Sequence, residues 1–294
     1  MSTSSEPPAI AGVRRSFVEA RGVRFHVTES GPEGGRPVIA LHGWPQHHWV
    51  YRDLLADPPP GLRIIAPDLP GYGWSGPAPH KWAKRDVAAD VLALADALGL
   101  DHFLLVGHDW GGHIGHLMVL EAPERIDGYL VLNMGHPWQS ARTFLRHVWP
   151  LLVYQPAMAA VGVPLSRRTK YLERFIFRVG PVRHRVDPAA ARVYAERFRD
   201  PVVARTARDT YRTFLLREVP SGAWHPEQRR ATVPIRALFG LGDAAVHPSW
   251  ASPETANADD YTFEPVDAGH FILDERPELV RAKLIALAAE TATP

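Results

Sequence analysis

Short apolar runs alternate with stretches of helical periodicity along the first half of the chain. The segments 83–98 and 112–120 carry apolar residues at helical spacing, and Gly99 follows the first where a C-cap is expected. Strands that alternate with helices predict a mostly parallel sheet with helices on both faces. Four apolar runs have the length and composition of its buried strands: Pro37–Leu41, Arg63–Pro67, Phe103–Gly107 and Gly128–Asn133.

The beginning of the chain has a different pattern. Two runs of alternating character, Arg15–Ala20 and Val23–Glu29, are separated by Arg21 and Gly22. Glycine adopts a positive φ without strain, which a two-residue turn between strands requires. We therefore predict an antiparallel hairpin at the start of the sheet.

A long interruption separates two groups of predicted strands. From about residue 137 to 230 the pattern is helical, with no convincing strand. Strands return at Ile235–Gly240 and Tyr261–Val266, and a last helix is predicted over 277–290. Such an insertion is a cap over the carboxyl edge of the sheet, where open α/β sheets bind ligands. The predicted organisation is core 1–136, helical cap 137–230 and core 231–294.

Composition removes several classes of function. The 294 residues carry a net charge of +1, which favours neither nucleic acid nor an anionic membrane as a partner. There is no cysteine, so disulfides, thiol catalysis and cysteine-bound zinc are excluded. The start of the chain is polar, and no run of apolar residues is long enough to cross a bilayer. These features predict a soluble cytoplasmic protein.

The sequence Gly-His-Asp-Trp-Gly at 107–111 is the most informative motif. It has the form of the nucleophile elbow, in which small residues let one side chain stand exposed between a strand and a helix. Here that side chain is Asp109 instead of a serine. A carboxylate can attack an sp³ carbon and form an ester that water cleaves, whereas a serine would form an inert ether. The alternative is that Asp109 only caps the following helix.

Five motifs in a fixed order carry a resemblance to a known family. They are His42–Pro45, Asp68–Ser75, Gly107–Gly112, Gly240–Asp243 and Gly269-His270. Together they resemble the α/β-hydrolase fold, and within it the epoxide hydrolases that use an aspartate nucleophile. The resemblance covers most of both core segments but is only local in the cap. It implies an α/β-hydrolase sheet flanked by helices, with Asp109 as the nucleophile.

The resemblance also implies an acid and a base. His270 would activate water against the ester, and Asp243 would orient its ring and stabilise the imidazolium. Asp267 and Asp274 are rivals of Asp243 because both lie close to His270 in sequence. In the related haloalkane dehalogenases the acid can instead follow the sixth strand, where this chain has Asn133.

Two backbone amides complete the implied core machinery. The N–H groups of Trp44 and Trp110 would stabilise the anion formed when water attacks the ester. Members of the family often have a cis peptide bond before the proline that corresponds to Pro45. From the residues alone, Gly-Trp-Pro also reads as a turn that ends a strand, and the family match decides between the two.

Epoxide opening further requires a proton or hydrogen bond for the departing oxygen. Two cap tyrosines provide it in the family, and Tyr211 and Tyr154 are the corresponding residues here. The local match is better for Tyr211 than for Tyr154. Tyr171 and Tyr194 also lie in the predicted cap, and helical tyrosines more often serve in packing.

The expected substrate is a small apolar epoxide, and no cofactor is expected. The substrate pocket is predicted to include His42, Pro45, Trp138 and Trp149, because aromatic walls suit apolar ligands. The pair His47-His48 has no third ligand in view, so no metal site is predicted. The sequence is also compatible with a homodimer.

Two other functions compete with epoxide hydrolysis. Dehalogenases use the same Asp-His-Asp machinery. Haloalkane dehalogenases commonly hold the halide with an asparagine, and this chain has Trp44 at that position. Fluoroacetate dehalogenases hold the substrate carboxylate with arginines just after the nucleophile, and this chain has no arginine there. A catalytically idle binding protein would show a broken set of catalytic residues. Here Asp109, Asp243 and His270 are all present.

Overall fold

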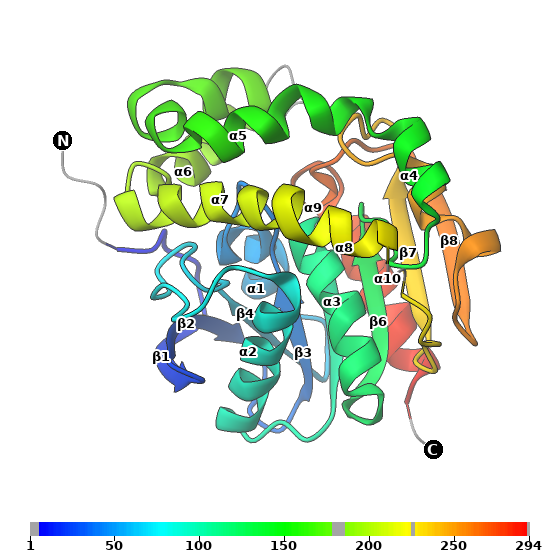
Figure 1. The fold of residues 1–294 in the computed structure, drawn as a ribbon. Coiled ribbons are helices and arrows are strands. Elements are labelled where there is room, and N and C mark those ends of the chain that lie inside the picture. The colour runs from blue at the N-terminus through cyan, green and yellow to red at the C-terminus, as the bar shows by residue number, and fades with distance from the viewer. Residues whose placement is uncertain (1–5, 178–185, 225–226, 293–294) are drawn as a thin grey trace.

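The computed structural model describes residues 6–177, 186–224 and 227–292. At its centre is an eight-stranded sheet with the order β1-β2-β4-β3-β5-β6-β7-β8 (Figure 1). Strands β3 to β8 are parallel, and β2 is antiparallel to both of its neighbours. The strands are Arg14–Ala20 (β1), Val23–Ser30 (β2), Arg36–Leu41 (β3), Leu62–Pro67 (β4), Phe103–His108 (β5), Ile126–Leu132 (β6), Ile235–Gly240 (β7) and Tyr261–Val266 (β8).

The predicted hairpin and the predicted sheet are confirmed. Strands β1 and β2 pair from Arg14 opposite Glu29 to Ala20 opposite Val23, around a turn in which Gly22 has a φ of 78°. The central strands β3, β5 and β6 are almost entirely buried, which explains why they read as continuous apolar runs instead of alternating ones.

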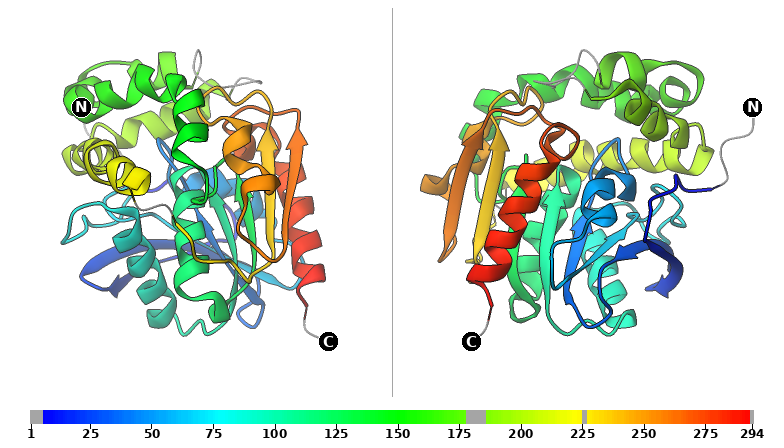
Figure 2. Two further views of the ribbon diagram at one scale, coloured as in Figure 1. Left: turned by 45° about the vertical axis from the view of Figure 1, so that its right-hand side comes forward. Right: turned by 180° about the vertical axis from the view of Figure 1, so that it is seen from behind.

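Helices cover both faces of the sheet, as Figures 1 and 2 show. On one face lie α2 (Lys84–Ala97) and α3 (Trp110–Glu121), and on the other α1 (Arg52–Ala56) and α10 (Pro277–Glu290). Helix α2 directs Val87, Val91 and Leu94 into the core. Leu98 is its C-cap and Gly99 follows with a φ of 67°, so the predicted helix end is confirmed.

A group of helices lies between β6 and β7 in the sequence and crosses the edge of the sheet at which β3 to β8 end (Figure 1). Asp187 and Asp200 cap two of them, accepting hydrogen bonds from the N–H groups of Ala189 and Val202. We call this group the inserted helices: Ala141–His147 (α4), Trp149–Arg168 (α5), Pro188–Arg197 (α6), Pro201–Thr213 (α7) and Val219–Trp224 (α8).

The boundaries predicted at 136/137 and 230/231 fall in the connections on either side of the inserted helices. Within the described part of 133–234 the structure contains no strand of the sheet, and the strongest packing among the inserted helices is between α5 and α7. Helix α5 bends at Val161, which has a non-helical φ of −123°. Pro164 follows three residues later and lacks the N–H that would bond across this bend.

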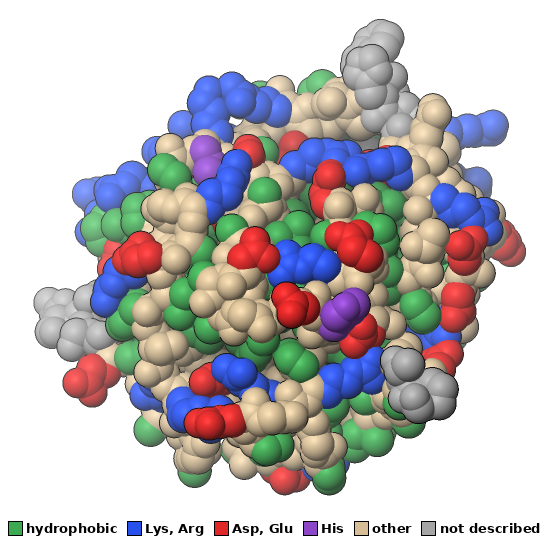
Figure 3. Space-filling view, turned by 90° about the horizontal axis from the view of Figure 1, so that it is seen from below, with side chains coloured by type: hydrophobic (Ala, Val, Ile, Leu, Met, Phe, Trp, Pro, Cys, Tyr) green, Lys and Arg blue, Asp and Glu red, His purple; other side chains and the backbone are tan. Residues whose placement is uncertain are grey.

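The surface carries charges of both signs. Figure 3 shows the face opposite the inserted helices, where basic, acidic and apolar side chains are intermixed without a field of one sign. Among the described residues, no helix is both long and apolar enough to cross a membrane.

Candidate active site

Asp109 stands at the sharp turn between β5 and α3. Its φ of 49° and ψ of −123° are unusual for a residue with a side chain, and such a conformation costs about 1–3 kcal/mol. Its side chain makes no capping hydrogen bond to α3, which removes the alternative that it is an ordinary helix cap. The strained backbone instead directs the carboxylate away from the helix and into the site.

Two glycines allow the backbone to approach Asp109. A Cβ on Gly111 would lie 2.3 Å from the carbonyl oxygen of Leu41. A Cβ on Gly43 would lie 2.4 Å from the Cβ of Asp109. No side chain fits at either distance, so the elbow and the turn after β3 require glycine by contact.

The two oxygens of Asp109 have different surroundings. Oδ2 accepts a hydrogen bond from the backbone N–H of Trp44 at 2.8 Å, and the N–H of Trp110 also bonds this carboxylate. Oδ1 lies 3.8 Å from Nε2 of His270. Both backbone amides predicted for the oxyanion therefore bond this carboxylate, with Trp44 at Oδ2, and Oδ1 is the oxygen near the histidine. The peptide bond between Trp44 and Pro45 is cis.

His270 and Asp243 form a tight pair. Nδ1 of His270 lies 2.8 Å from Oδ2 of Asp243. The same oxygen accepts a hydrogen bond from Nδ2 of Asn133 at 2.9 Å, and Oδ1 accepts the backbone N–H groups of Ala245 and Val246. Asp243 thus has a fixed orientation towards the ring of His270.

The rival acids are engaged elsewhere or point elsewhere. Asp274 is buried and binds Arg52 at 2.7 Å, Gln46 at 2.7 Å and the hydroxyl of Tyr194. Asp267 is exposed on its loop. The carboxylate that contacts His270 is therefore Asp243.

For both Asp109 and His270, burial and the neighbouring groups act on the pKa in opposite directions. Burial raises the pKa of Asp109, although His270 and the amide N–H groups act to lower it. Burial also acts to lower the pKa of His270, but Asp243 and then Asp109 outweigh it and raise the pKa to about 9. The charge on Asp109 therefore contributes to the basicity of His270, and neutralising Asp109 would weaken that basicity.

Two tyrosines of the inserted helices lie opposite the elbow. Tyr211 of α7 is buried, and its ring meets that of Tyr154 of α5 edge to face, with 5.8 Å between centroids. The ring of Trp44 stacks on Tyr154 at 5.7 Å and meets Tyr211 at 5.2 Å. Burial and then other groups, Asp109 among them, raise the pKa of both tyrosines. Both hydroxyls are therefore protonated donors at neutral pH.

The rival tyrosines are placed elsewhere. Tyr171 stacks on Phe175 with 5.2 Å between centroids. The hydroxyl of Tyr194 contacts Asp274 and Arg52. Neither hydroxyl takes part in the cluster around Asp109.

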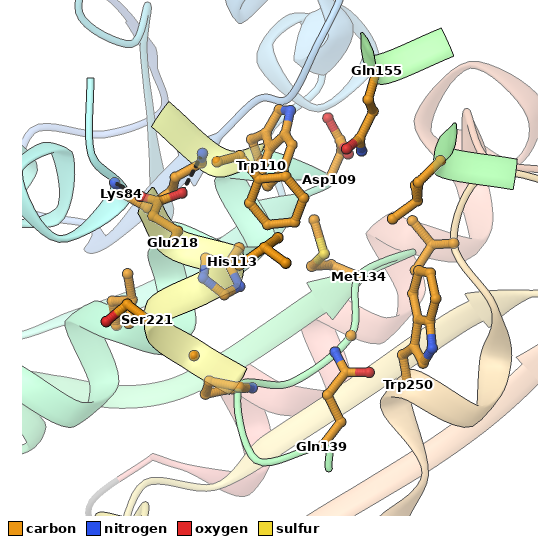
Figure 4. A pocket seen from close by; sticks show the side chains of 18 of the residues that line it. Lys84, Asp109, Trp110, His113, Met134, Gln139, Gln155, Glu218, Ser221 and Trp250 are labelled. Carbon is orange, nitrogen blue, oxygen red and sulfur yellow. Dashed lines mark hydrogen bonds and ion pairs between the residues drawn. The ribbon is translucent and has the colours of Figure 1, made fainter. Parts of the chain in front are cut away.

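A cavity of about 480 Å³ opens beside Asp109, between α3 and the inserted helices (Figure 4). Close to Asp109 its walls include Trp110, Met134, Tyr154 and Gln155. Other walls are polar and include His113, Gln139, Ser221 and the ion pair of Lys84 with Glu218, whose atoms lie 2.6 Å apart. The cavity can accommodate a ligand that is apolar at one point and polar at another.

Comparison with known proteins adds the family. Residues 36–277 match the family model described as the alpha/beta hydrolase fold, which is most of the chain. The chain belongs to the α/β-hydrolase fold family. The resemblance inferred from the five motifs is thereby confirmed, as is the predicted fold class.

Its relatives include two kinds of enzyme. Over 132 residues the chain is 36% identical to epoxide hydrolase 4 of Mus musculus; the match covers 44% of this chain and 37% of that protein. It is 28% identical to haloalkane dehalogenase 2 of Mycobacterium tuberculosis, with 92% of this chain and 93% of the relative covered. The solved epoxide hydrolase CorEH superposes with a TM-score of 0.76 at 23% identity, covering 95% of this chain and 100% of that one. This last likeness concerns the fold.

Within this α/β-hydrolase, the four residues predicted for the pocket do not line the cavity. His42 is buried beneath it, where its Nε2 accepts the N–H of Leu69 at 2.9 Å, and Pro45 is buried in the turn. Trp138 donates its indole N–H to the carbonyl of Arg229, and Trp149 is 74% exposed. Besides Asp109, Trp110 and Tyr154, the walls come from residues that carry no motif, Gln155 and His113 among them.

The pair His47-His48 has neighbours that the sequence did not reveal. His26 and His48 each place Nδ1 2.9 Å from an oxygen of Asp68, and all three are buried. The same carboxylate accepts the backbone N–H groups of His48 and Trp74. Asp68 thus has four donors already, and this cluster holds the loops behind the site together.

Proposed function

We propose that this α/β-hydrolase is an epoxide hydrolase that forms a vicinal diol through a covalent ester on Asp109. The observation that carries the proposal is the surroundings of one carboxylate. Asp109 has one oxygen among backbone donors and the other towards His270, and two protonated tyrosines lie opposite it. In this proposal residues 137–230, which contain the inserted helices, form a cap that supplies the two tyrosines. The core supplies the nucleophile, the acid, the base and the backbone donors.

In the first step Oδ1 of Asp109 attacks one carbon of the epoxide. The carbon–oxygen bond of the ring breaks, and the departing oxygen receives a proton from Tyr211 or Tyr154. Such an oxygen is a poor leaving group, so donors placed opposite the nucleophile lower the barrier. The raised pKa of both tyrosines keeps these protons available at neutral pH.

In the second step Nε2 of His270 takes a proton from water, which attacks the carbonyl carbon of the ester. The negative charge develops on Oδ2, which the N–H of Trp44 already bonds, and the N–H of Trp110 is a second donor to the same group. The ester bond then breaks, and the diol oxygen takes the proton from His270. Asp109 is left as a carboxylic acid, and its proton returns to the tyrosinate formed in the first step, so that both groups regain their starting state. Asp243 stabilises the intermediate imidazolium.

Haloalkane dehalogenation is the second candidate. It is supported by the relative of that name and by the indole N–H of Trp44, which is buried and has no hydrogen-bond partner among the described residues. Such a donor suits a leaving halide. The tyrosine pair favours the epoxide, because halide departure requires no proton.

The test is diol formation from styrene oxide by the wild-type protein and by Asp109→Ala. We expect diol from the wild type and a loss on the order of 10⁴-fold in the variant. Halide release from haloalkanes and haloacetates is measured beside it. Halide release without diol would overturn epoxide hydrolysis in favour of dehalogenation.

A further inference from the structure

Gln155 is a polar residue on the apolar helix α5, directly after Tyr154. Its side chain is only 2% exposed, yet it lines the cavity that Asp109 also lines. Figure 4 shows Gln155 projecting from α5 towards the side of the cavity that Asp109 occupies. A buried amide at this place must be explained, because removing it from water is unfavourable unless it is hydrogen-bonded.

One half of this amide has no partner. Oε1 of Gln155 is buried and accepts no hydrogen bond from any described residue. The other half faces Tyr154, and a hydrogen bond from Gln155 acts to lower the pKa of that tyrosine against the larger effect of burial. An acceptor of this kind suits a ligand that brings an N–H or O–H group.

The position of Gln155 limits where that donor lies on the substrate. The epoxide must sit between Asp109 and the hydroxyls of Tyr154 and Tyr211 for the proposed reaction. Gln155 lines the same cavity as Asp109, so a substituent close to the ring is the part of an epoxide substrate that its amide would meet. The other polar walls, His113, Ser221 and Gln139, lie farther from Asp109 (Figure 4).

We propose that Gln155 determines specificity by accepting a hydrogen bond from a hydroxyl or amide N–H on the carbon adjacent to the epoxide. The preferred substrates are then epoxy alcohols or epoxy amides, and not purely hydrocarbon epoxides. This inference rests on the proposed epoxide hydrolysis and narrows its substrate class.

Three oxiranes that differ in one substituent test the inference: hydroxymethyl, methoxymethyl or ethyl on the same ring carbon. The first alone donates a hydrogen bond, and ethyl has nearly its size. For the wild type we expect kcat/KM to be roughly tenfold higher for hydroxymethyl than for either analogue. In Gln155→Leu and in Gln155→Met, which keeps the length of the side chain, the three values are expected to become similar.

Gln139→Leu is the matched control, because it makes the same exchange at a glutamine farther along the cavity wall. It is expected to keep the preference for the hydroxymethyl substrate, whatever its effect on the overall rate. Equal wild-type rates for the three substrates, or an unchanged preference in both Gln155 variants, would overturn the inference. The inference would also be overturned if the Gln155 variants lost kcat/KM equally for all three substrates, because the amide would then act in the reaction itself. Absence of diol from every substrate would instead refute the proposed function.

Discussion

On the sheet side of the site, Asp243 is held by two backbone N–H groups and by Asn133, and Asp109 by the amides of Trp44 and Trp110. On the helical side, Tyr154 and Tyr211 are held mainly by ring packing with each other and with Trp44. Hydrogen bonds to backbone fix a group to within a few tenths of an ångström, whereas ring packing tolerates small sliding.

The difference has a consequence for function. The proposed nucleophile, acid and base lie where hydrogen bonds to the backbone fix their position. The proposed proton donor Tyr154 and the proposed specificity residue Gln155 lie on α5, whose main packing partner is another inserted helix, α7. We infer that changes on the sheet side abolish the reaction, and that changes on the helical side retune it.

The largest effect is expected on the sheet side. Asp243→Asn keeps the shape of the side chain but removes the charge that raises the pKa of His270. We expect kcat to fall roughly 10³–10⁴-fold. Asp267→Asn is the matched control, since Asp267 is exposed and is the rival acid in the sequence. A similar loss in both variants would contradict the assignment of the acid.

A smaller effect is expected on the helical side. Tyr211→Phe and Tyr154→Phe each remove one donor to the departing oxygen while the other remains, and we expect losses in kcat of roughly 10–10²-fold. Steady-state diol formation measures both. Tyr171→Phe makes the same change at a tyrosine that only packs on Phe175, and its rate should match the wild type. Wild-type rates in both site variants would remove the tyrosines from the mechanism.

The dependence on pH tests the coupling between two groups of the sheet side, His270 and Asp109. The pKa of His270 is raised to about 9 in the free enzyme, with the charge of Asp109 among the causes. Ester formation removes that charge, so the pKa of His270 in the ester lies below this value. Only neutral His270 accepts a proton from water, so ester hydrolysis slows as the pH falls through the lowered pKa. Single-turnover measurements across pH should give a midpoint below about 9, and a rate that falls with rising pH would contradict the role.

The smallest effect is expected for Asn133→Gly. Asn133 has a φ of 47°, which glycine also adopts, so the exchange removes the amide without straining the backbone. Asp243 keeps its two backbone donors, so kcat should fall only threefold to tenfold, roughly the value of one hydrogen bond. A loss as large as that of Asp243→Asn would mean that Asn133 is itself essential.

The same contrast explains what the sequence could predict. Strands β7 and β8 and helix α10 have the predicted bounds, because buried runs between turn residues determine them locally. The elbow was predictable because Gly107 and Gly111 are required by contacts within a few residues of Asp109 or with the adjacent strand. In the sequence, Asn133 stood out only because related enzymes can have the acid at this position. Its hydrogen bond to Asp243 joins segments far apart in the chain, so sequence patterns could not predict it.

The helical side was less predictable. Periodicity predicts helices in the insertion, but it does not say which face of α5 turns towards Asp109. Trp149 begins α5 and points to solvent, whereas Gln155 lies in the cavity wall. Their directions depend on how α5 packs against α7, a contact between segments about fifty residues apart. The one available signal was an amide within an apolar helical stretch.

The most direct test of the central claim is the mass of His270→Gln after incubation with styrene oxide. Without the base, the ester should form and persist, so the protein should gain the mass of one whole epoxide, located on the peptide that contains Asp109. The double variant Asp109→Ala, His270→Gln should gain nothing. An unmodified single variant, or an adduct on any residue other than Asp109, would contradict the account.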